Sequence, residues 1–151
     1  MFGQDPKAGH SWTIYTRDGQ VHKTGWSNGN VTVRDYHNKA VLIAAAEAAS
    51  EVPQGSITHF ISNKKWFTDI VNRGRAARIA SDYKRSSGNG TLAYVDEWRA
   101  LDVVLGERGL SESAGPAKTE AAQRYLEQEN EAASLATRNM HRSFGDWERS
   151  R

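Results

Sequence analysis

Seven cationic side chains gather in the middle of the sequence, and they are the residues best suited to bind an anionic ligand. Only Asp69 and Asp82 oppose them, so residues 64–85 carry a balance of +5, whereas the whole chain has a formal charge of +2. Clustered Lys and Arg side chains attract phosphate groups and release counterions on binding them. We therefore predict a phosphate-binding surface, with a solvated helix face as the alternative. The seven are Lys64, Lys65, Arg73, Arg75, Arg78, Lys84 and Arg85.

Two aromatic residues, Trp66 and Tyr83, interleave with these cations. An aromatic ring beside a basic surface can stack on a base or a sugar. For Trp66, packing in the core is the alternative, and we favour it.

Length and composition predict a single intracellular domain. The chain has 151 residues, five Trp and no Cys, which excludes disulfides and zinc–thiolate sites and suits a reducing compartment. We find no signal-peptide pattern and no run of eighteen apolar residues, so we expect neither secretion nor a membrane span. We divide the chain into a flexible lead-in (1–10), one domain (11–140) and a basic tail (141–151).

The first part of the domain predicts three antiparallel strands and a crossover. Strands are expected at 11–17, 20–26 and 31–36, with tight turns at Asp18-Gly19 and Asn28-Gly29. An Ala-rich helix over 39–50 then leads to a strand over 56–61. Because such a crossover implies parallel pairing in a covered sheet, we expect 56–61 to lie centrally. His59 should then be a hydrogen-bonded core histidine and not a metal ligand.

The second part is predicted to be mainly helical. Ser62 can cap a helix that carries Trp66 and Phe67, and a short basic helix is expected over 75–83. A further helix shows the apolar stripe Trp98, Leu101, Val104 and Leu105 and ends at Gly106. Residues 110–116 show only a short, weak pattern. Thr119 caps a long last helix over about 120–140.

Three local patterns, taken with this order of elements, resemble the ribonuclease H family over about residues 12–138. The stretch HNKAVLIAAAEAA is similar to its first helix, ISNKKWF to the end of its central strand, and DEWRALDVVL to the helix that follows its basic protrusion. The resemblance implies an α/β fold with a ribonuclease H-like mixed sheet, three antiparallel strands plus a parallel central strand, flanked by helices. It also implies a strand near residues 110–116, and contact between the basic protrusion and an RNA/DNA hybrid.

The positions at which this family holds two divalent cations depart from its pattern. Hard cations need carboxylate oxygens to hold them close together. The resemblance puts the first ligand at Arg17 or Asp18, the second at Ala40 or Val41, and the third at Asn63. The fourth falls on Ala133 or Ser134, with Glu131 nearby. Asp18, Asn63 and Glu131 are thus the remnant candidates, and we expect neither the usual two-metal site nor a cofactor.

Three hypotheses follow for function. The first is a catalytically degenerate ribonuclease H-like domain that binds the backbone of a nucleic-acid duplex or hybrid. The second is a protein-interaction module, such as an inhibitor or assembly subunit, on the same scaffold. The third is a magnesium-dependent ribonuclease with relocated carboxylates, for which Asp18, Asp35 and Glu131 are the candidates.

Overall fold

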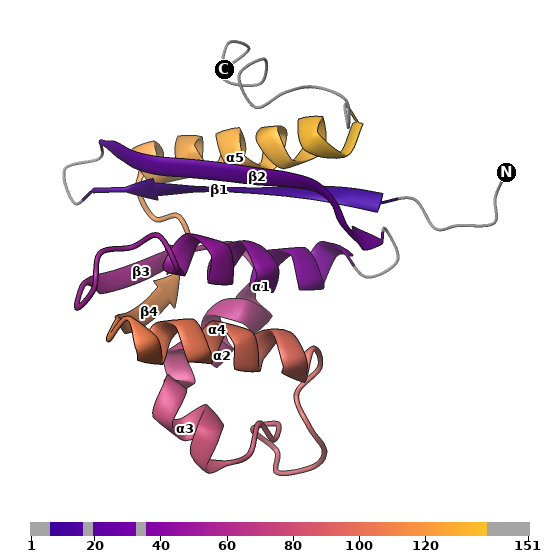
Figure 1. The fold of residues 1–151 in the computed structure, drawn as a ribbon, viewed down its shortest axis with the longest axis vertical. Helices are drawn as coiled ribbons and strands as arrows, with labels where there is room; N and C mark the ends of the chain where they lie inside the picture. Colours follow the sequence, from indigo (N-terminus) through magenta and orange to yellow (C-terminus); the bar gives the residue numbers. More distant parts are fainter. Residues whose placement is uncertain (1–6, 17–19, 33–35, 139–151) are drawn as a thin grey trace, which may run out of the picture.

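A computed structural model of the protein describes residues 7–16, 20–32 and 36–138. This part of the chain forms a mixed α/β fold, with one antiparallel and one parallel two-stranded sheet flanked by helices (Figure 1). The elements are β1 (Lys7–Tyr15), β2 (Val21–Thr32), α1 (Tyr36–Ala49), β3 (Ile57–Ile61), α2 (Lys65–Arg73), α3 (Arg75–Ala80), α4 (Val95–Glu107), β4 (Ser111–Gly115) and α5 (Glu120–Arg138).

The first two strands form a long hairpin. The backbone N–H of Thr16 donates to the carbonyl of Gln20 over 2.8 Å, which closes the hairpin around the predicted first turn. That turn, Asp18-Gly19, itself lies outside the described residues. β1 begins at Lys7, inside the predicted lead-in.

The second predicted turn, at Asn28-Gly29, is wrong because β2 runs through it without reversing. The ladder shifts its register here instead: Ala8 pairs with Val31, whereas His10 pairs with Ser27. Two steps along β1 therefore face four steps along β2, and the turn-prone residues are absorbed in this irregularity. In the described residues the antiparallel sheet consequently has two strands and not the three that were predicted.

Helices α1 and α5 pack on opposite faces of the hairpin (Figure 1). Successive side chains of a strand point to opposite faces. Ser11 accordingly bonds to Glu129 of α5 (Oγ to Oε2, 2.8 Å), whereas Trp12 donates from Nε1 to Oε1 of Glu47 in α1 over 3.2 Å. Thr13 also donates to Glu129.

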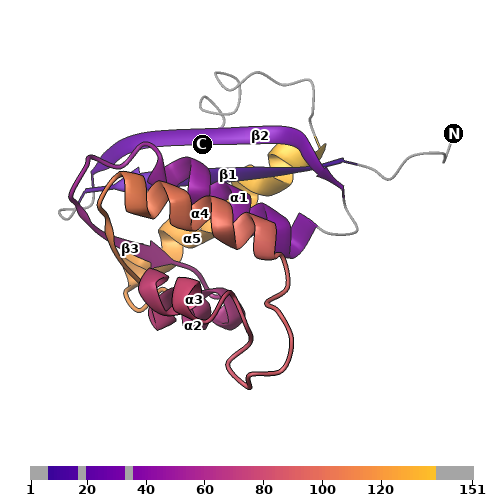
Figure 2. The same ribbon diagram turned by 60° about the horizontal axis from the view of Figure 1, so that its bottom comes forward.

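Helix α1 is enclosed on more than one side. Every residue from Asn38 to Ala49 is buried or half-buried. The helix contacts β1 and β2 on one side and α4 on another, and Figure 2 shows α1 and α4 lying side by side. A helix that is apolar around most of its circumference belongs in the interior, and small Ala side chains allow its neighbours to approach closely.

The second sheet pairs β3 with β4 in parallel, in the register Ile57 with Ser111 through Ile61 with Gly115. The strand predicted over 56–61 is confirmed, and so is the strand that the family resemblance implied near 110–116. The central placement of β3 is wrong for the part of the chain that is described, since β4 is the only strand that pairs with it there. The side chain of Ile57 is 89% exposed.

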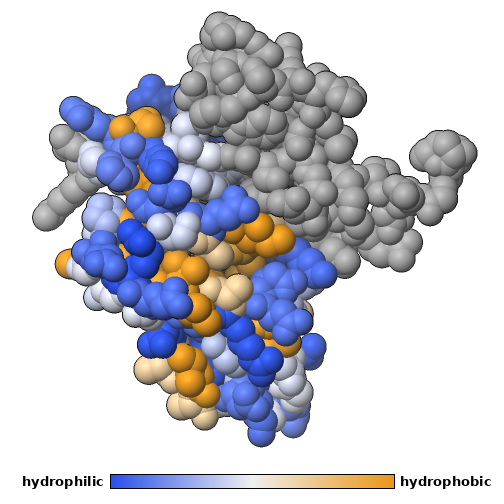
Figure 3. Space-filling model, in the orientation of Figure 1, coloured by the Kyte–Doolittle hydropathy of each residue, from blue (hydrophilic) through white to orange (hydrophobic). Residues whose placement is uncertain are grey.

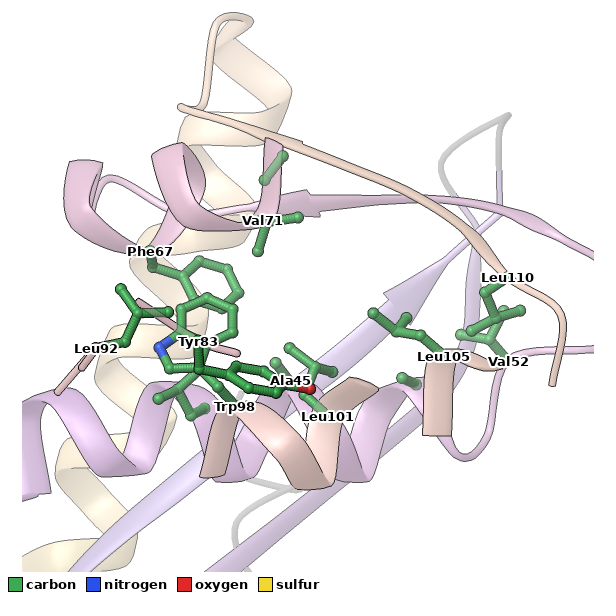
Figure 4. Packing of buried hydrophobic residues seen from close by; sticks show 13 residues of the cluster. Ala45, Val52, Phe67, Val71, Tyr83, Leu92, Trp98, Leu101, Leu105 and Leu110 are labelled. Atoms are coloured by element: carbon green, nitrogen blue, oxygen red, sulfur yellow. The ribbon is translucent and has the colours of Figure 1, made fainter. Parts of the chain in front are cut away.

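The core lies between α1, α2 and α4. Trp98 stacks on Phe67 with ring centroids 5.8 Å apart, and Tyr83 and Leu92 close the same end of the cluster (Figure 4). The predicted stripe on α4 is confirmed: Trp98, Leu101 and Leu105 are buried and Val104 is partly buried.

The ends of α4 and α5 follow ordinary capping rules. Thr119 Oγ1 accepts a bond from the backbone N–H of Ala122 over 3.0 Å, which confirms the predicted cap of α5. α4 ends one residue later than predicted. Gly109 then takes a φ of +61°, and the N–H of Leu110 donates to the carbonyl of Leu105 over 3.0 Å. This is the geometry of a Schellman motif, in which glycine carries the left-handed residue.

Candidate nucleic-acid interface

The seven predicted cations divide into two groups by burial. Three of them turn inward and are called the inner arginines: Arg73, Arg75 and Arg78. The other four are exposed and are called the outer cations: Lys64, Lys65, Lys84 and Arg85.

Arg78 lies at the centre of the inner group. Its side chain is 0% exposed and that of Asp102 is 2% exposed. Arg78 Nη2 lies 2.6 Å from Asp102 Oδ1, and Nε lies 3.0 Å from Oδ2, so the pair is bidentate. The guanidinium also stands 5.4 Å from the ring centroid of Trp98. Such a satisfied, buried charge pair is structural, and the prediction that Arg78 contacts phosphate is withdrawn.

Arg78 also fixes the end of a neighbouring helix. Its Nη1 donates to the carbonyls of Ile70 and Val71 over 2.8 and 3.0 Å. Both carbonyls belong to the end of α2, where the regular helical hydrogen bonds run out, and that of Val71 also accepts from the N–H of Gly74. One arginine therefore joins α2, α3 and α4.

The other inner arginines extend this network. Arg75 Nε donates to the carbonyl of Asp102 over 2.9 Å, and its backbone N–H donates to Glu112 Oε1 over 2.7 Å. The guanidinium lies against Gly106, where an added Cβ would come within 2.5 Å of it. Arg73 Nη2 donates to Ser81 Oγ over 3.3 Å. Gly106, predicted as a helix stop, thus provides space for Arg75.

Two of the outer cations stand where α2 begins. Lys64 is the N-cap residue of this helix, and its backbone N–H donates to Ser62 Oγ over 3.1 Å. The N-cap therefore lies two residues after Ser62 and makes no side-chain cap, so the prediction that Ser62 is the N-cap is wrong. Lys65 pairs with Asp69 one turn along, with Nζ and Oδ2 2.6 Å apart. Both partners are exposed, so water and a phosphate can compete for this lysine.

The other two outer cations lie in the loop between α3 and α4. The loop has an ordered base: Lys84 bridges to Thr91, and the N–H of Arg85 donates to the carbonyl of Gly90 over 2.9 Å. Buried Tyr83 and Leu92 anchor its two sides in the core. The loop therefore presents two cations on a base that is attached to the α2–α4 core.

The aromatic candidates are mainly structural. Trp66 is half-buried and packs edge-on against Phe67 and Trp98, at centroid distances of 5.9 and 6.3 Å. Tyr83 is buried beneath Arg99, whose guanidinium carbon lies 5.2 Å from the ring centroid. Burial, reinforced by the negative charge of Asp102, raises the pKa of the Tyr83 phenol. Tyr83 is consequently not available to stack on a base.

The positions expected to hold metal show mixed outcomes. Asp18 and Asp35 lie outside the described residues. Asn63 is exposed and its Oδ1 accepts a bond from the N–H of Ala117 over 3.4 Å, whereas Glu131 is exposed on α5. Ala40 is buried. Within residues 7–16, 20–32 and 36–138, no three His, Asp or Glu side chains gather closely enough to hold a metal ion.

His59 corrects one prediction. Its Nδ1 lies 2.9 Å from Ser113 Oγ, so the residue is hydrogen-bonded as expected. It is exposed, however, and the prediction that it belongs to the core is wrong. Alternation along β3 correctly placed His59 on the same face as Ile57 and Ile61, but this face of the strand is exposed.

Sequence analysis missed the acidic partners of the inner arginines. Asp102 lies on the buried side of α4, together with Leu101 and Leu105. A carboxylate at a core position implies that a cation is buried beside it. That signal was available. Glu112, in the short strand β4, offered none.

No helix among the described residues is long and apolar enough to cross a membrane. The face of the described residues seen in Figure 3 is mostly hydrophilic, with hydrophobic residues gathered across its middle.

Comparison with known proteins gives a structural likeness alone. No protein-family model matches the chain, and no curated protein sequence matches it. The structure of a foamy viral protease–reverse transcriptase in complex with an RNA/DNA hybrid matches with a TM-score of 0.55 at 11% sequence identity. The match covers 85% of this chain but 19% of that one. The chain therefore shares the fold of about one fifth of a reverse-transcriptase polypeptide.

Proposed function

We propose that this protein is a ribonuclease H-like domain that has lost its catalytic carboxylates and binds the backbone of a nucleic-acid duplex, in particular an RNA/DNA hybrid. The observation that carries the proposal is the separation of the cations. Four stand exposed at the start of α2 and in the loop between α3 and α4, while the inner arginines join α2, α3 and α4 from within. A cationic surface on a fixed base suits the recognition of phosphates by shape.

Two further observations support it. The structurally similar reverse transcriptase was solved with an RNA/DNA hybrid bound. At the predicted ligand positions, Ala40, Val41 and Asn63 carry no carboxylate. A site that has lost its anions no longer repels the phosphates of a bound strand, so binding can persist without cleavage.

The test is a titration with labelled single strand, DNA duplex and RNA/DNA hybrid at two salt concentrations, with and without Mg²⁺. We expect binding of duplex or hybrid that weakens steeply with salt, needs no metal and is not followed by cleavage. An affinity that does not change with salt concentration, or no binding at low salt, would contradict the proposal.

A protein-interaction module on the same scaffold is the second candidate. The exposed apolar side chains of β3, Ile57 and Ile61, favour it. Co-purification with a protein partner at high salt, together with no affinity for nucleic acid, would decide for it.

The third hypothesis, a metal-dependent ribonuclease with relocated carboxylates, stays a prediction. It requires hydrolysis of a hybrid with Mg²⁺ or Mn²⁺ that Asp18→Asn abolishes.

A further inference from the structure

The loop between α3 and α4 protrudes from the molecule and presents two serine hydroxyls at its tip (Figure 2). The backbone N–H of Gly88 donates to the carbonyl of Arg85 over 2.8 Å, which closes a tight turn. Ser86 and Ser87 occupy the two central positions of that turn. Residues 84–91 are all exposed, so both hydroxyls stand beside the outer cations of the same loop.

Glycine leaves space around this tip. Gly88 and Gly90 both take a φ of +79°, and apart from the adjacent residues no atom lies within 4 Å of the place where a Cβ would stand on either one. Ser87 Oγ accepts a bond from the N–H of Asn89 over 3.3 Å, so its own hydroxyl proton is not used in that bond. A glycine-containing surface loop can open into the extended form in which an enzyme binds a segment of chain. Ser87 is therefore accessible to an enzyme that modifies side chains.

Two other described serines follow an arginine by three positions, but the structure makes both inaccessible. Ser81, which follows Arg78, is half-buried and donates from Oγ to the carbonyl of Arg78 over 3.1 Å. Ser111, which follows Arg108, belongs to β4, and its N–H donates to the carbonyl of Ser56 over 3.1 Å. Neither segment can leave its place without opening a helix end or a strand pair. The loop tip alone combines preceding cations with a free backbone.

We propose that Ser87 is a phosphorylation site for a serine kinase of the class that recognises basic residues before the serine. Lys84 and Arg85 lie three and two positions before it. Carboxylates in the substrate groove of such a kinase pair with cations at these positions. The Oγ of Ser87 attacks the γ-phosphorus of ATP, the hydroxyl proton passes to a carboxylate base of the kinase, and the bond between that phosphorus and ADP breaks.

The phosphate changes the charge of the surface that is proposed to bind nucleic acid, and this consequence rests on the proposed function. A phosphoserine carries about −1.5 to −2 charges at pH 7. It offsets the two positive charges of Lys84 and Arg85 within the same short loop. Among the outer cations, only Lys64 and Lys65 then remain to contact phosphates. Phosphorylation of Ser87 therefore weakens binding without altering the core.

Incorporation of phosphate tests the site without nucleic acid. The full chain is incubated with ATP and the catalytic subunit of cyclic-AMP-dependent protein kinase, which is a kinase of this class, and the modified residues are mapped by mass spectrometry. We expect phosphate on Ser87 and none on Ser81 or Ser111. Ser87→Ala should remove the phosphate from this loop. A chain without phosphate on Ser87, or with as much on Ser111 as on Ser87, overturns the proposal.

A titration with labelled RNA/DNA hybrid tests the consequence for binding. The slope of log K against log salt should be lower for the phosphorylated chain by nearly two units, about 0.9 for each neutralised cation, and phosphatase should restore it. Gln123→Glu with Gln128→Glu adds a similar negative charge at exposed positions on α5 and is the matched control, which should leave the slope unchanged.

The two proposals fail in different ways. An unmodified chain that does not bind hybrid contradicts the proposed function, while mass spectrometry still decides whether Ser87 is the modified residue. A phosphorylated chain that binds hybrid with the slope of the unmodified chain overturns the regulatory role of Ser87 and leaves the proposed function intact. A decrease of the same size in the α5 control would mean that only net charge matters, which also overturns that role.

Discussion

The inner arginines and the outer cations come from one short stretch of sequence, yet they meet opposite environments. Arg78 lies under Trp98 and is paired with Asp102, whereas Lys84 and Arg85 stand in water on the loop that follows. A buried charge must be matched by a partner because its hydration is lost, while an exposed one keeps its hydration and remains free to bind phosphate. A count of charges along the chain therefore overstates the binding surface.

The inner pair should give the largest change in stability. Arg78→Met leaves Asp102 buried without its cation, and we expect a loss of about 3–5 kcal/mol in the free energy of unfolding. Urea denaturation followed by circular dichroism measures it. Adding Asp102→Leu should recover much of the loss, because a buried pair can be replaced by apolar residues at little cost. A loss below about 1 kcal/mol for Arg78→Met would show that the pair is not structural.

The outer cations should change binding and leave stability alone. Lys84→Ala with Arg85→Ala removes two of the proposed phosphate contacts, which should lower the slope of log K against log salt by nearly two units, about 0.9 per contact. We expect the free energy of unfolding to change by less than about 0.5 kcal/mol. Lys118→Ala with Arg124→Ala removes the same charge from exposed positions elsewhere and is the matched control. Equal effects of the two pairs would mean that only net charge matters.

Buried Tyr83 should make the stability of the fold depend on pH in alkaline solution. Because the pKa of its phenol is raised in the fold, the folded state holds the proton more tightly than the unfolded state. The resulting stability is fully present below the unfolded pKa and is lost as the pH rises through the folded pKa. The wild type should thus lose more stability on alkaline titration than Tyr83→Phe. If the stability of the two proteins changed with pH in the same way, the phenol of Tyr83 would be exposed to water and not buried.

The exposed ion pair between Lys23 and Glu51 should give the smallest change in stability, against which the change from the buried pair can be compared. Lys23 and Glu51 stand 2.6 Å apart, the same separation as Arg78 and Asp102, but both are exposed. Lys23 lowers the pKa of Glu51, so its contribution is present above the usual glutamate pKa and disappears as the pH falls. Lys23→Met should therefore differ slightly from wild type at neutral pH and not in acid. If Lys23→Met lost as much free energy of unfolding as Arg78→Met, burial could not explain the large effect of Arg78→Met.

Much of the fold follows from the sequence, because helical periodicity is a local property. The stripe on α4, the Thr119 cap and strand β3 were predicted from neighbouring residues, whereas the expectation of a strand at β4 rested on the family resemblance. Asn28-Gly29 failed because a turn-prone dipeptide can also be absorbed in a strand irregularity, and the choice depends on the opposite strand.

The candidate site was less predictable, because it depends on distant partners. Periodicity placed His59 on one face of β3 but could not tell whether anything covers that face. The sequence likewise identified Arg78 as a cation, but the residue that neutralises it lies 24 positions away in α4.

The enclosure of α1 has a consequence for how the molecule opens. This helix joins the hairpin, which also carries α5, to the body built from α2 and α4, and α5 makes its principal contacts with the hairpin. Amide hydrogens of β1, β2 and α5 should therefore exchange with deuterium as one cooperative unit, and those of α2 and α4 as another. The amides of α1 should exchange last, since either unit alone still protects the helix.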